Sequence, residues 1–297
     1  GKLRGLGATI KNFVGVGGGT VPWAKGYEQV AVSVDQLGQR QGSICFWTDI
    51  WHYDIHSVLE LRLNNGDIKQ RTYELSIGVT IPDLFMELVE KGKNKEDDTF
   101  YLFDPHKVRQ VMEWSLEDCY DEKRGNGTWR RRYYECVKAA EAGLLNDYNA
   151  KTGKVIERFK KVSALSLFKK MCKSQKETGF PFMMYRDEVN RMNPNKHAGM
   201  IYCSNLCSEI AQNQKPTYII EETREGGELI IRKQLGDFVV CNLASLNLAV
   251  WYFLSPEDRR RAIKIAMRGL DNVIDHNKDR ITVAQAVYTN ERYRAVG

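Results

Sequence analysis

An amide, a thiol and a carboxylate alternate within "YCSNLCSEI" (residues 202–210), at Asn205, Cys207 and Glu209. In an extended or loop segment, side chains two residues apart project to the same side. One surface would then carry a carboxylate able to take a proton from a substrate hydroxyl and an amide able to orient that hydroxyl. Cys207 has no neighbouring histidine, and an adjacent glutamate tends to raise the pKa of a thiol. This thiol is therefore better suited to hydrogen-atom transfer than to ionic attack.

The same residues also allow a structural interpretation without chemistry. Cys203 and Cys207 could both be small buried apolar side chains. Glu209 could begin a solvated helix. Spacing alone favours this interpretation, so a chemical role needs support from other parts of the chain.

The remaining cysteines and histidines give weaker signals. His52 and His56 in "WHYDIH" are four residues apart but lack the glutamate of the H-E-x-x-H pattern, so local hydrogen bonding is the simpler account. Cys203 and Cys207 have no second close pair, which argues against zinc. We expect no metal site. The odd number of cysteines, seven, favours a reducing cytoplasm over a secreted disulfide framework.

Composition sets the protein class. The chain has 297 residues, 42% of them hydrophobic, which is enough for one large or two small globular domains. No apolar run is long enough to cross a bilayer, so we expect no membrane partner. The net charge is +6, but the basic runs 130–132 and 259–261 fall in helical patterns rich in acids. We therefore expect solvated helix faces and no nucleic-acid partner, while the charge suits small ligands that carry phosphate.

Strands alternate with helices along the chain, which predicts an α/β fold. Residues 1–41 are Gly-rich and predicted to be irregular. The predicted strands are 42–50, 71–81, 99–103 and 180–185, with a hairpin at 217–233 and a strand-like start to 238–250. The predicted helices are 54–63, 82–91, 104–116, 128–145, 162–177 and 255–277.

Capping residues support several of these helices. Asp104 and Ser255 are expected N-caps, each followed by proline, and Gly179 is an expected helix end. The last helix carries an apolar stripe that we expect to be buried, made of Ala262, Ile263, Ala266, Met267, Leu270, Val273 and Ile274.

Several motifs in matching order give the chain a family resemblance. "SNLCSEI" (204–210) resembles the finger-loop motif of the catalytic (large, α) subunit of ribonucleotide reductases. "GKLRGLGATI" (1–10) resembles the start of that family's effector-binding loop, and "VDQLGQRQGSICFWTDIWHYDI" (34–55) its second specificity loop with the following strand. "VVCNLASLNL" (239–248) resembles the segment of the second active-site cysteine. The resemblance spans essentially the whole chain but only a central part of a family subunit.

The resemblance implies a fold and a division of the chain. Family members carry a ten-stranded α/β barrel with the finger loop threaded through its centre. Residues 1–41 would form the effector-binding and specificity-loop region. Residues 42–297 would form part of the catalytic barrel, with the finger loop near 202–210.

The resemblance also implies roles for individual residues. Cys207 matches the cysteine that becomes a transient thiyl radical and abstracts the 3′ hydrogen of the ribonucleotide. Glu209 matches the base that takes the 3′-hydroxyl proton, and Asn205 the amide that hydrogen-bonds the ribose. Cys241 matches one of the two cysteines that reduce the 2′ position and end as a disulfide. The second of these is expected before residue 1, and Cys203 is interpreted as packing.

Two further groups of residues match the family's allosteric parts. Arg4 and Lys11 fall where the family places basic contacts to the phosphates of the effector nucleotide. Asp35, Gln36 and Arg40 fall in the loop that relays effector identity to the substrate base.

The implied activity is the reduction of ribonucleoside diphosphates to 2′-deoxyribonucleotides for DNA synthesis. The chain would bind no cofactor itself: the radical would come from a metal-containing small (β) subunit, or, as the less favoured source, from adenosylcobalamin. Electrons would come from thioredoxin or glutaredoxin. The other expected partners are the ribonucleotide substrate, dNTP and ATP effectors, the remaining parts of the large subunit and, when complete, a second copy.

The expected location is the cytoplasm, or the host cytoplasm for a viral source. The isolated chain is expected to be inactive. The alternative is a non-catalytic remnant that binds deoxynucleotide effectors or a reductase partner.

Overall fold

The structure, a computed structural model, describes all residues except 1–2, 12, 14, 35–37, 39–40 and 150–151. The chain forms two compact units, Gly1–Met192 and Asn193–Gly297, which are described separately. Among the described helices, none combines the length and the apolarity that a membrane span requires.

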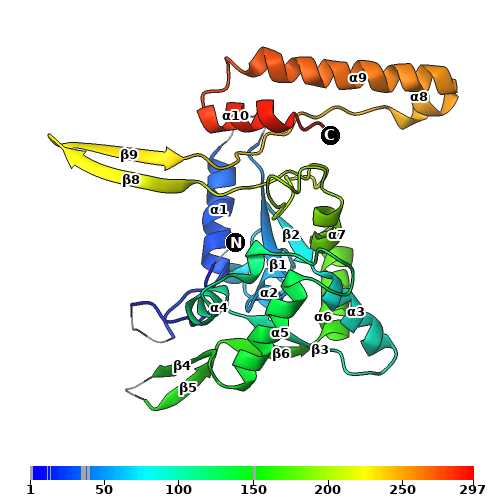
Figure 1. The fold of residues 1–297 in the computed structure, drawn as a ribbon. Helices are drawn as coiled ribbons and strands as arrows, with labels where there is room; N and C mark the ends of the chain where they lie inside the picture. The colour runs from blue at the N-terminus through cyan, green and yellow to red at the C-terminus, as the bar shows by residue number, and fades with distance from the viewer. Residues whose placement is uncertain (1–2, 12, 14, 35–37, 39–40, 150–151) are drawn as a thin grey trace. The chain divides into compact units, whose positions relative to one another are not determined.

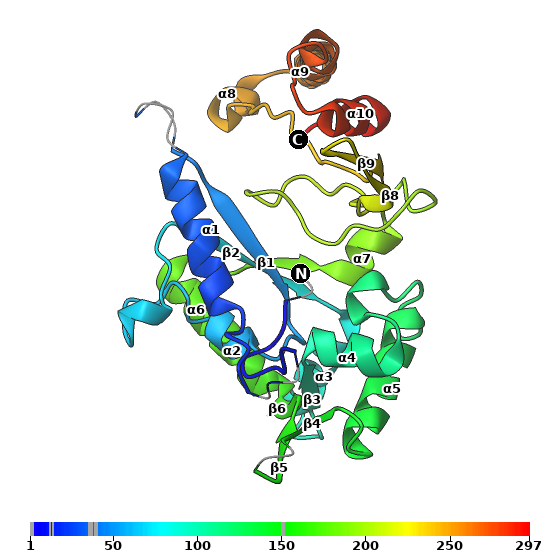
Figure 2. The same ribbon diagram turned by 90° about the vertical axis from the view of Figure 1, so that its left-hand side faces the viewer.

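A parallel sheet lies at the centre of the first unit. Its strands β1 (Ile44–Asp49), β2 (Leu75–Ile81) and β7 (Phe182–Tyr185) pair in the order β1-β2-β7. Parallel neighbours need crossover connections. Accordingly α2 (Ile55–Val58) follows β1, and the chain between β2 and β7 includes α3 (Asp83–Lys93) and α6 (Ala164–Thr178), which pack together (Figures 1 and 2). The predicted α/β class is confirmed.

Smaller elements surround this sheet. The strand β3 (Thr99–Phe103) pairs antiparallel with β6 (Phe159–Ser163), and β4 (Asn146–Asn149) with β5 (Lys154–Glu157). Further helices of the unit are α4 (Pro105–Met112), α5 (Thr128–Glu141), α7 (Arg186–Arg191) and two single 3₁₀ turns, η1 (Ile68–Gln70) and η2 (Leu116–Asp118).

Aromatic stacking joins these elements into the core. The ring of Phe100 on β3 lies between Phe85 of α3 and Tyr133 of α5, with centroid distances of 5.0 and 5.2 Å. Trp129 stacks on the same Tyr133 ring at 4.9 Å. All four side chains are buried. Large apolar side chains in such contacts dominate the energetics of a core.

Local capping chemistry sets the helix boundaries that the sequence predicted. The Asp104 carboxylate accepts the His106 amide at 2.9 Å, which starts α4 at Pro105. This helix ends at Met112, earlier than predicted, because Glu113 takes the left-handed conformation at φ 63°. Gly179, at φ 78°, ends α6 as expected.

The prediction that residues 1–41 are irregular is wrong over 13 of them. The helix α1 (Val21–Ser33) begins after Thr20, with Pro22 in its first turn, where a missing amide hydrogen costs nothing. Its buried residues follow helical spacing: Val21, Ala24, Glu28 and Ala31. This face packs on β1 and β2 (Figure 2).

The second unit contains a hairpin and three helices. The hairpin strands β8 (Tyr218–Glu225) and β9 (Glu228–Gln234) turn at Gly226 and Gly227, both at positive φ, as the sequence predicted (Figure 1, yellow). The helices are α8 (Leu248–Phe253), α9 (Pro256–Asn277) and α10 (Ala284–Tyr293). The segment 238–250 was expected to start as a strand, but residues 238–241 form none. Its end belongs to helix α8.

The apolar stripe predicted to be buried on α9 is largely exposed. Ser255 caps the helix as expected, accepting the Asp258 amide at 3.1 Å. Within α9, however, the buried residue is Ile274. The side chains of Ile263 and Met267 are about half exposed. Arg294, which follows α10, contacts α9 at Asp271 and Asp275, on either side of Ile274 in the sequence. The pattern identifies the helix, but burial depends on what packs against it.

Buried His52 predicts acid sensitivity of the first unit. Its Nε2 lies 3.0 Å from the Leu3 carbonyl and its Nδ1 accepts the Asp54 amide at 3.0 Å, so the ring is neutral. Asp54 and Asp104 favour the charged ring, but burial outweighs them and lowers the pKa of His52. The His52 ring therefore binds a proton more readily in the unfolded chain than in the folded one. The stability that depends on neutral His52 is complete above about pH 6.5 and falls as the pH drops below it.

We expect a lower urea midpoint at pH 5 than at pH 7, and a smaller difference between these midpoints in His52→Gln. The control is His276→Gln, because His276 is exposed on α9, and it should keep the pH dependence of the unmodified chain. Equal pH dependence in His52→Gln and the unmodified chain would show that this ring is not the cause.

Candidate functional site

The loop at residues 204–210 is closed at its base by two side chains. The Asn205 Oδ1 accepts the Ile210 amide at 3.1 Å, and the Ser204 hydroxyl donates to the Ile210 carbonyl at 2.6 Å. Between these anchors Cys207, Ser208 and Glu209 are exposed. The loop therefore presents the thiol and the carboxylate at its tip.

The loop is not an extended strand. The chain turns at Leu206 and Cys207, and Ser208 takes the left-handed conformation at φ 68°. Such a backbone in a residue other than glycine costs free energy and persists where the surroundings impose it. The spacing of two between Asn205, Cys207 and Glu209 therefore does not by itself bring these side chains together.

Cys241 is held beside this loop by hydrogen bonds on both sides. The Val240 carbonyl accepts from Gln212 Nε2 at 3.0 Å, just beyond the loop. On the other side, Asn242 Nδ2 donates to Asn290 Oδ1 at 2.9 Å and to the Ala295 carbonyl at 3.1 Å. Two segments that are distant in sequence thus fix the backbone that carries the thiol.

The electrostatics of Cys241 link it to the loop residues. Burial raises the pKa of the Cys241 thiol, and the nearby Glu209 carboxylate raises it further, while a hydrogen bond with the Asn205 side chain acts in the opposite direction. The thiol therefore stays protonated at neutral pH. The structure brings Cys241 together with Asn205 and Glu209.

Sequence reasoning missed the residues that build this site from outside the loop. The Gly297 amide donates to the Asn242 carbonyl at 3.0 Å, and the Ala244 amide donates to the Gly297 carbonyl at 3.1 Å. A Cβ at Gly297 would lie 3.1 Å from Glu209 Cγ, so a side chain there would crowd the carboxylate. Asn242 offered a signal, because an amide inside the apolar run "FVVCNLASL" needs buried partners.

Cys203 lies in a different environment from Cys207. It is half-buried, its amide donates to Gln214 Oε1 at 2.9 Å, and Gln214 Nε2 approaches its sulfur at 3.3 Å. These contacts fit a packing position at the stem of the loop, while Cys207 is exposed at its tip.

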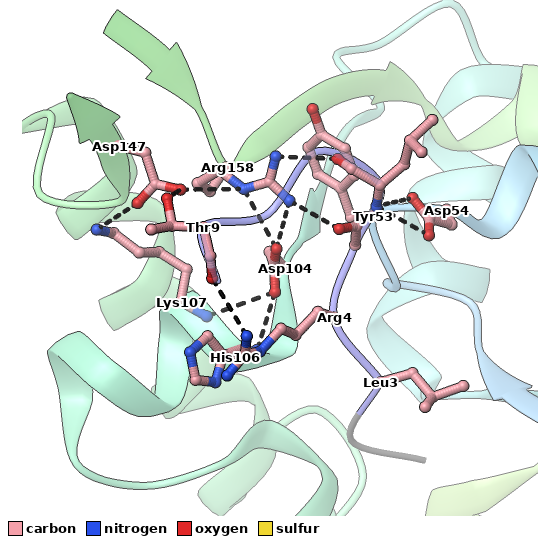
Figure 3. A network of polar contacts seen from close by, with 12 residues as sticks. Leu3, Arg4, Thr9, Tyr53, Asp54, Asp104, His106, Lys107, Asp147 and Arg158 are labelled. Carbon is pink, nitrogen blue, oxygen red and sulfur yellow. Dashed lines mark hydrogen bonds and ion pairs between the residues drawn. The ribbon is translucent and has the colours of Figure 1, made fainter. Parts of the chain in front are cut away.

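The residues matched to effector binding belong to the first unit. Arg4 is half-buried and donates from Nη1 to the Thr9 carbonyl at 3.2 Å (Figure 3). Burial lowers the pKa of His106, and the positive charge of Arg4 lowers it further, so these two side chains are neighbours. Lys11 is exposed, with a left-handed backbone at φ 47°. Asp35, Gln36 and Arg40 lie outside the described residues, between α1 and β1.

Across the described part of the chain, no group of three His, Cys, Asp or Glu side chains is arranged to hold a metal ion. Both ring nitrogens of His52 contact backbone groups: the Nδ1 contact with the Asp54 amide is local, as the interpretation of "WHYDIH" anticipated, while the Nε2 contact is with the distant Leu3 carbonyl.

Comparison with known proteins gives the family. The sequence model of the ribonucleotide reductase barrel domain matches residues 1–297. Ribonucleoside-diphosphate reductase subunit alpha of Treponema pallidum is 40% identical over 301 residues, covering 100% of this chain and 33% of that protein. The subunits alpha of Helicobacter pylori strain J99 and Chlamydia trachomatis are 32% and 34% identical over 99% of this chain, which spans 38% and 24% of their lengths. This chain belongs to the ribonucleotide reductase large-subunit family, through its barrel domain.

Proposed function

We propose that this chain forms the catalytic centre of a ribonucleoside-diphosphate reductase α subunit, which reduces ribonucleotides to 2′-deoxyribonucleotides. One observation carries this proposal: Cys241 lies against the loop of Asn205, Cys207 and Glu209, although 34 residues separate Cys241 from Cys207. The family match over the whole chain supports it. In this proposal β1, β2 and β7 are strands of the ten-stranded barrel and residues 204–210 are its finger loop.

The loop residues would carry the first steps. Cys207, as a thiyl radical, takes the hydrogen atom from C3′ of the ribose. Glu209 takes the proton of the 3′-hydroxyl, and Asn205 holds a ribose hydroxyl by hydrogen bonding. A radical at C3′ weakens the neighbouring C2′–O bond, so the 2′-hydroxyl leaves as water once a thiol supplies a proton. A protonated Cys241 beside Glu209 suits that step.

The electrons would come from two thiols. Cys241 and a second cysteine, which the family resemblance places outside this chain, end as a disulfide. Cys207 then returns its hydrogen atom to C3′ and regains the thiyl state. One ribonucleotide and two thiols thus give one deoxyribonucleotide, one disulfide and one water. Water must be kept from the radical, which a loop inside a closed barrel achieves.

The proposal includes partners and regulation. The radical originates in a metal-containing small (β) subunit, with adenosylcobalamin as the less favoured source, and thioredoxin or glutaredoxin reduces the disulfide. Residues 1–41 form the allosteric region of a homodimeric cytoplasmic enzyme, and residues 42–297 contribute to its barrel. Arg4 and Lys11 bind the phosphates of a dNTP or ATP effector, and the loop of Asp35, Gln36 and Arg40 relays effector identity to the substrate site.

Cys241→Ser tests the reductive role. In the reconstituted large subunit that includes this chain, with the small subunit and thioredoxin, we expect the variant to reduce CDP only at background rate, because serine cannot form the disulfide. The measurement is deoxycytidine product per minute. Cys203→Ser is the matched control, because Cys203 contacts Gln214 at the stem of the loop, and should keep normal turnover. Normal turnover by Cys241→Ser would remove this residue from the mechanism.

A further inference from the structure

The N-terminal segment, residues 3–20, carries Arg4 and Lys11, and its described residues have little regular structure. Its middle is tied internally, since the Gly7 amide donates to the Gly17 carbonyl at 2.7 Å and the Gly17 amide to the Ala8 carbonyl at 2.9 Å. The backbone around Arg4 has one such internal bond, from the Ala8 amide to the Gly5 carbonyl at 3.1 Å, and is otherwise held by side chains from elsewhere in the first unit. The position of the Arg4 guanidinium therefore depends on those side chains.

Arg158 is the first of these anchors. This residue is 1% exposed and comes from the chain between β5 and β6. Its Nη1 donates to the Leu6 carbonyl at 3.0 Å and its Nη2 to the Gly5 carbonyl at 3.2 Å (Figure 3). The same guanidinium pairs with the buried Asp104 carboxylate and lies over the Tyr53 ring at 4.6 Å. A buried charge needs such partners, and only the planar fork of arginine reaches all of them together.

Asp54 is the second anchor. Its carboxylate accepts the Leu6 amide at 2.9 Å and the Thr20 amide at 3.0 Å, so it joins the two ends of the segment. Leu6 thus has its amide held by Asp54 and its carbonyl by Arg158. The fit is close: a Cβ at Gly5 would approach the Tyr53 ring to 2.9 Å, and one at Gly19 would lie 2.6 Å from Asp54 Oδ2.

The side chain of Arg4 is tied to the same network through Thr9. The Thr9 carbonyl accepts from Arg4, and the Thr9 hydroxyl donates to Asp147 Oδ2 at 2.7 Å. Asp147 also accepts from Lys107 at 3.0 Å and lies 3.8 Å from Arg158 Nε (Figure 3). Arg158 therefore contacts the backbone next to Arg4. It also lies close to Asp147, which holds Thr9, the residue whose carbonyl accepts from the Arg4 guanidinium.

We propose that Arg158 is a positioning residue for effector binding: by holding the Gly5 and Leu6 carbonyls, and by pairing with the Asp147 carboxylate that fixes Thr9, it sets the place of the Arg4 guanidinium that meets the effector phosphates. This inference rests on the proposed effector role of Arg4 and Lys11. A cation displaced by an ångström loses much of its contact with a bound phosphate, because directed hydrogen bonds weaken steeply with misalignment.

Arg158→Lys tests the proposal, because lysine keeps the charge near Asp104 but cannot bond both carbonyls. In the reconstituted large subunit, the dTTP concentration that gives half-maximal stimulation should rise by about tenfold to a hundredfold, a range expected for ångström-scale misplacement. The stimulated rate at saturating dTTP should return to that of the unmodified enzyme. A merely structural role would lower this plateau and the melting temperature and leave the half-maximal concentration unchanged, which would overturn the proposal.

Arg62→Lys is the matched control. Arg62 also donates to a backbone carbonyl, that of Leu75 at 3.2 Å, and lies over an aromatic ring, that of Phe180 at 4.7 Å. Neither of these contacts involves residues 3–20. This variant should keep the dTTP concentration of the unmodified enzyme, and an equal rise in both variants would contradict a specific role for Arg158.

Thr9→Val decides the matter if Arg158→Lys does not fold. Valine has the shape of threonine but cannot donate to Asp147, so the dTTP concentration should rise by about two- to tenfold, the scale of one lost hydrogen bond. An unchanged value there would overturn the proposal.

Arg4→Ala and Lys11→Ala separate this inference from the proposed effector site. If neither variant alters dTTP stimulation, the effector site is wrong. If both weaken it while Arg158→Lys and Thr9→Val do not, the effector site stands and the positioning role fails.

Discussion

A reductase that carries Cys207→Ser is expected to convert no CDP above background, a loss on the order of 10⁴-fold or more, the scale on which removal of an essential nucleophile acts in other enzymes. The reason is the strength of the bond that must break. An O–H bond is stronger than an S–H bond, so serine cannot form the radical that would take the 3′ hydrogen. Serine otherwise resembles cysteine in size, and Cys207 is exposed at the loop tip. The folded structure should therefore be unaffected.

The measurement is single-turnover and steady-state reduction of CDP, with substrate binding followed in parallel. CDP binding should be retained in Cys207→Ser, since the variant keeps Asn205 and Glu209. Cys203→Ser, four residues away, should retain both binding and turnover. Turnover by Cys207→Ser at more than a few per cent of the normal rate would remove the thiyl role and favour the non-catalytic alternative.

The second large effect concerns stability. Asp49→Ala is expected to destabilise the first unit by about 3–5 kcal/mol, the usual cost of leaving a buried charge without its partner. Asp49, at the end of β1, accepts from Arg186 Nη1 at 2.7 Å and from the Thr80 hydroxyl. Arg186, which is 1% exposed, also donates to the Glu117 carbonyl. Removing the carboxylate leaves this buried guanidinium without the charge of Asp49.

Urea unfolding followed by tryptophan fluorescence is the measurement, because Trp23, Trp47, Trp51, Trp114 and Trp129 all belong to the first unit. The paired variant Asp49→Ala with Arg186→Met should recover much of the loss, since removing both charges leaves none unpaired. Glu90→Ala is the control, because the Glu90–Lys93 pair is exposed and should contribute little. A midpoint for Asp49→Ala equal to that of Glu90→Ala would contradict the argument.

Elements whose signals are local could be predicted from the sequence. The start of α4 depends on Asp104 and the start of α9 on Ser255, and each side chain bonds an amide two or three residues away. The hairpin turn needs only Gly226 and Gly227. Helix α1 was missed because glycines precede it and its capping residue, Thr20, makes no side-chain bond. Burial of α9 could not be predicted, because it depends on which element covers the helix.

The candidate site shows the same division. The residue types of Asn205, Cys207 and Glu209 identified them as a set able to do chemistry. Their spacing, however, does not predict the turn at Cys207 or the left-handed backbone of Ser208. The approach of Cys241 depends on Gln212, Asn242 and Asn290, whose hydrogen bonds span 28 to 53 residues. Such contacts arise only when the fold assembles. The resemblance to a family therefore supplied what local patterns could not.

The anchoring of residues 3–20 has a consequence for synthesis on the ribosome. Leu6 is translated 48 residues before Asp54 and 152 residues before Arg158, the two side chains that hold it. A nascent chain exposes this segment without its final shape until translation has passed Arg158. In a polypeptide that stalls earlier, the Gly5 and Leu6 carbonyls lack that anchor, and the exposed segment is accessible to cellular proteases. Truncated products would thus be cleaved in the same segment that, in the finished chain, carries Arg4 and Lys11.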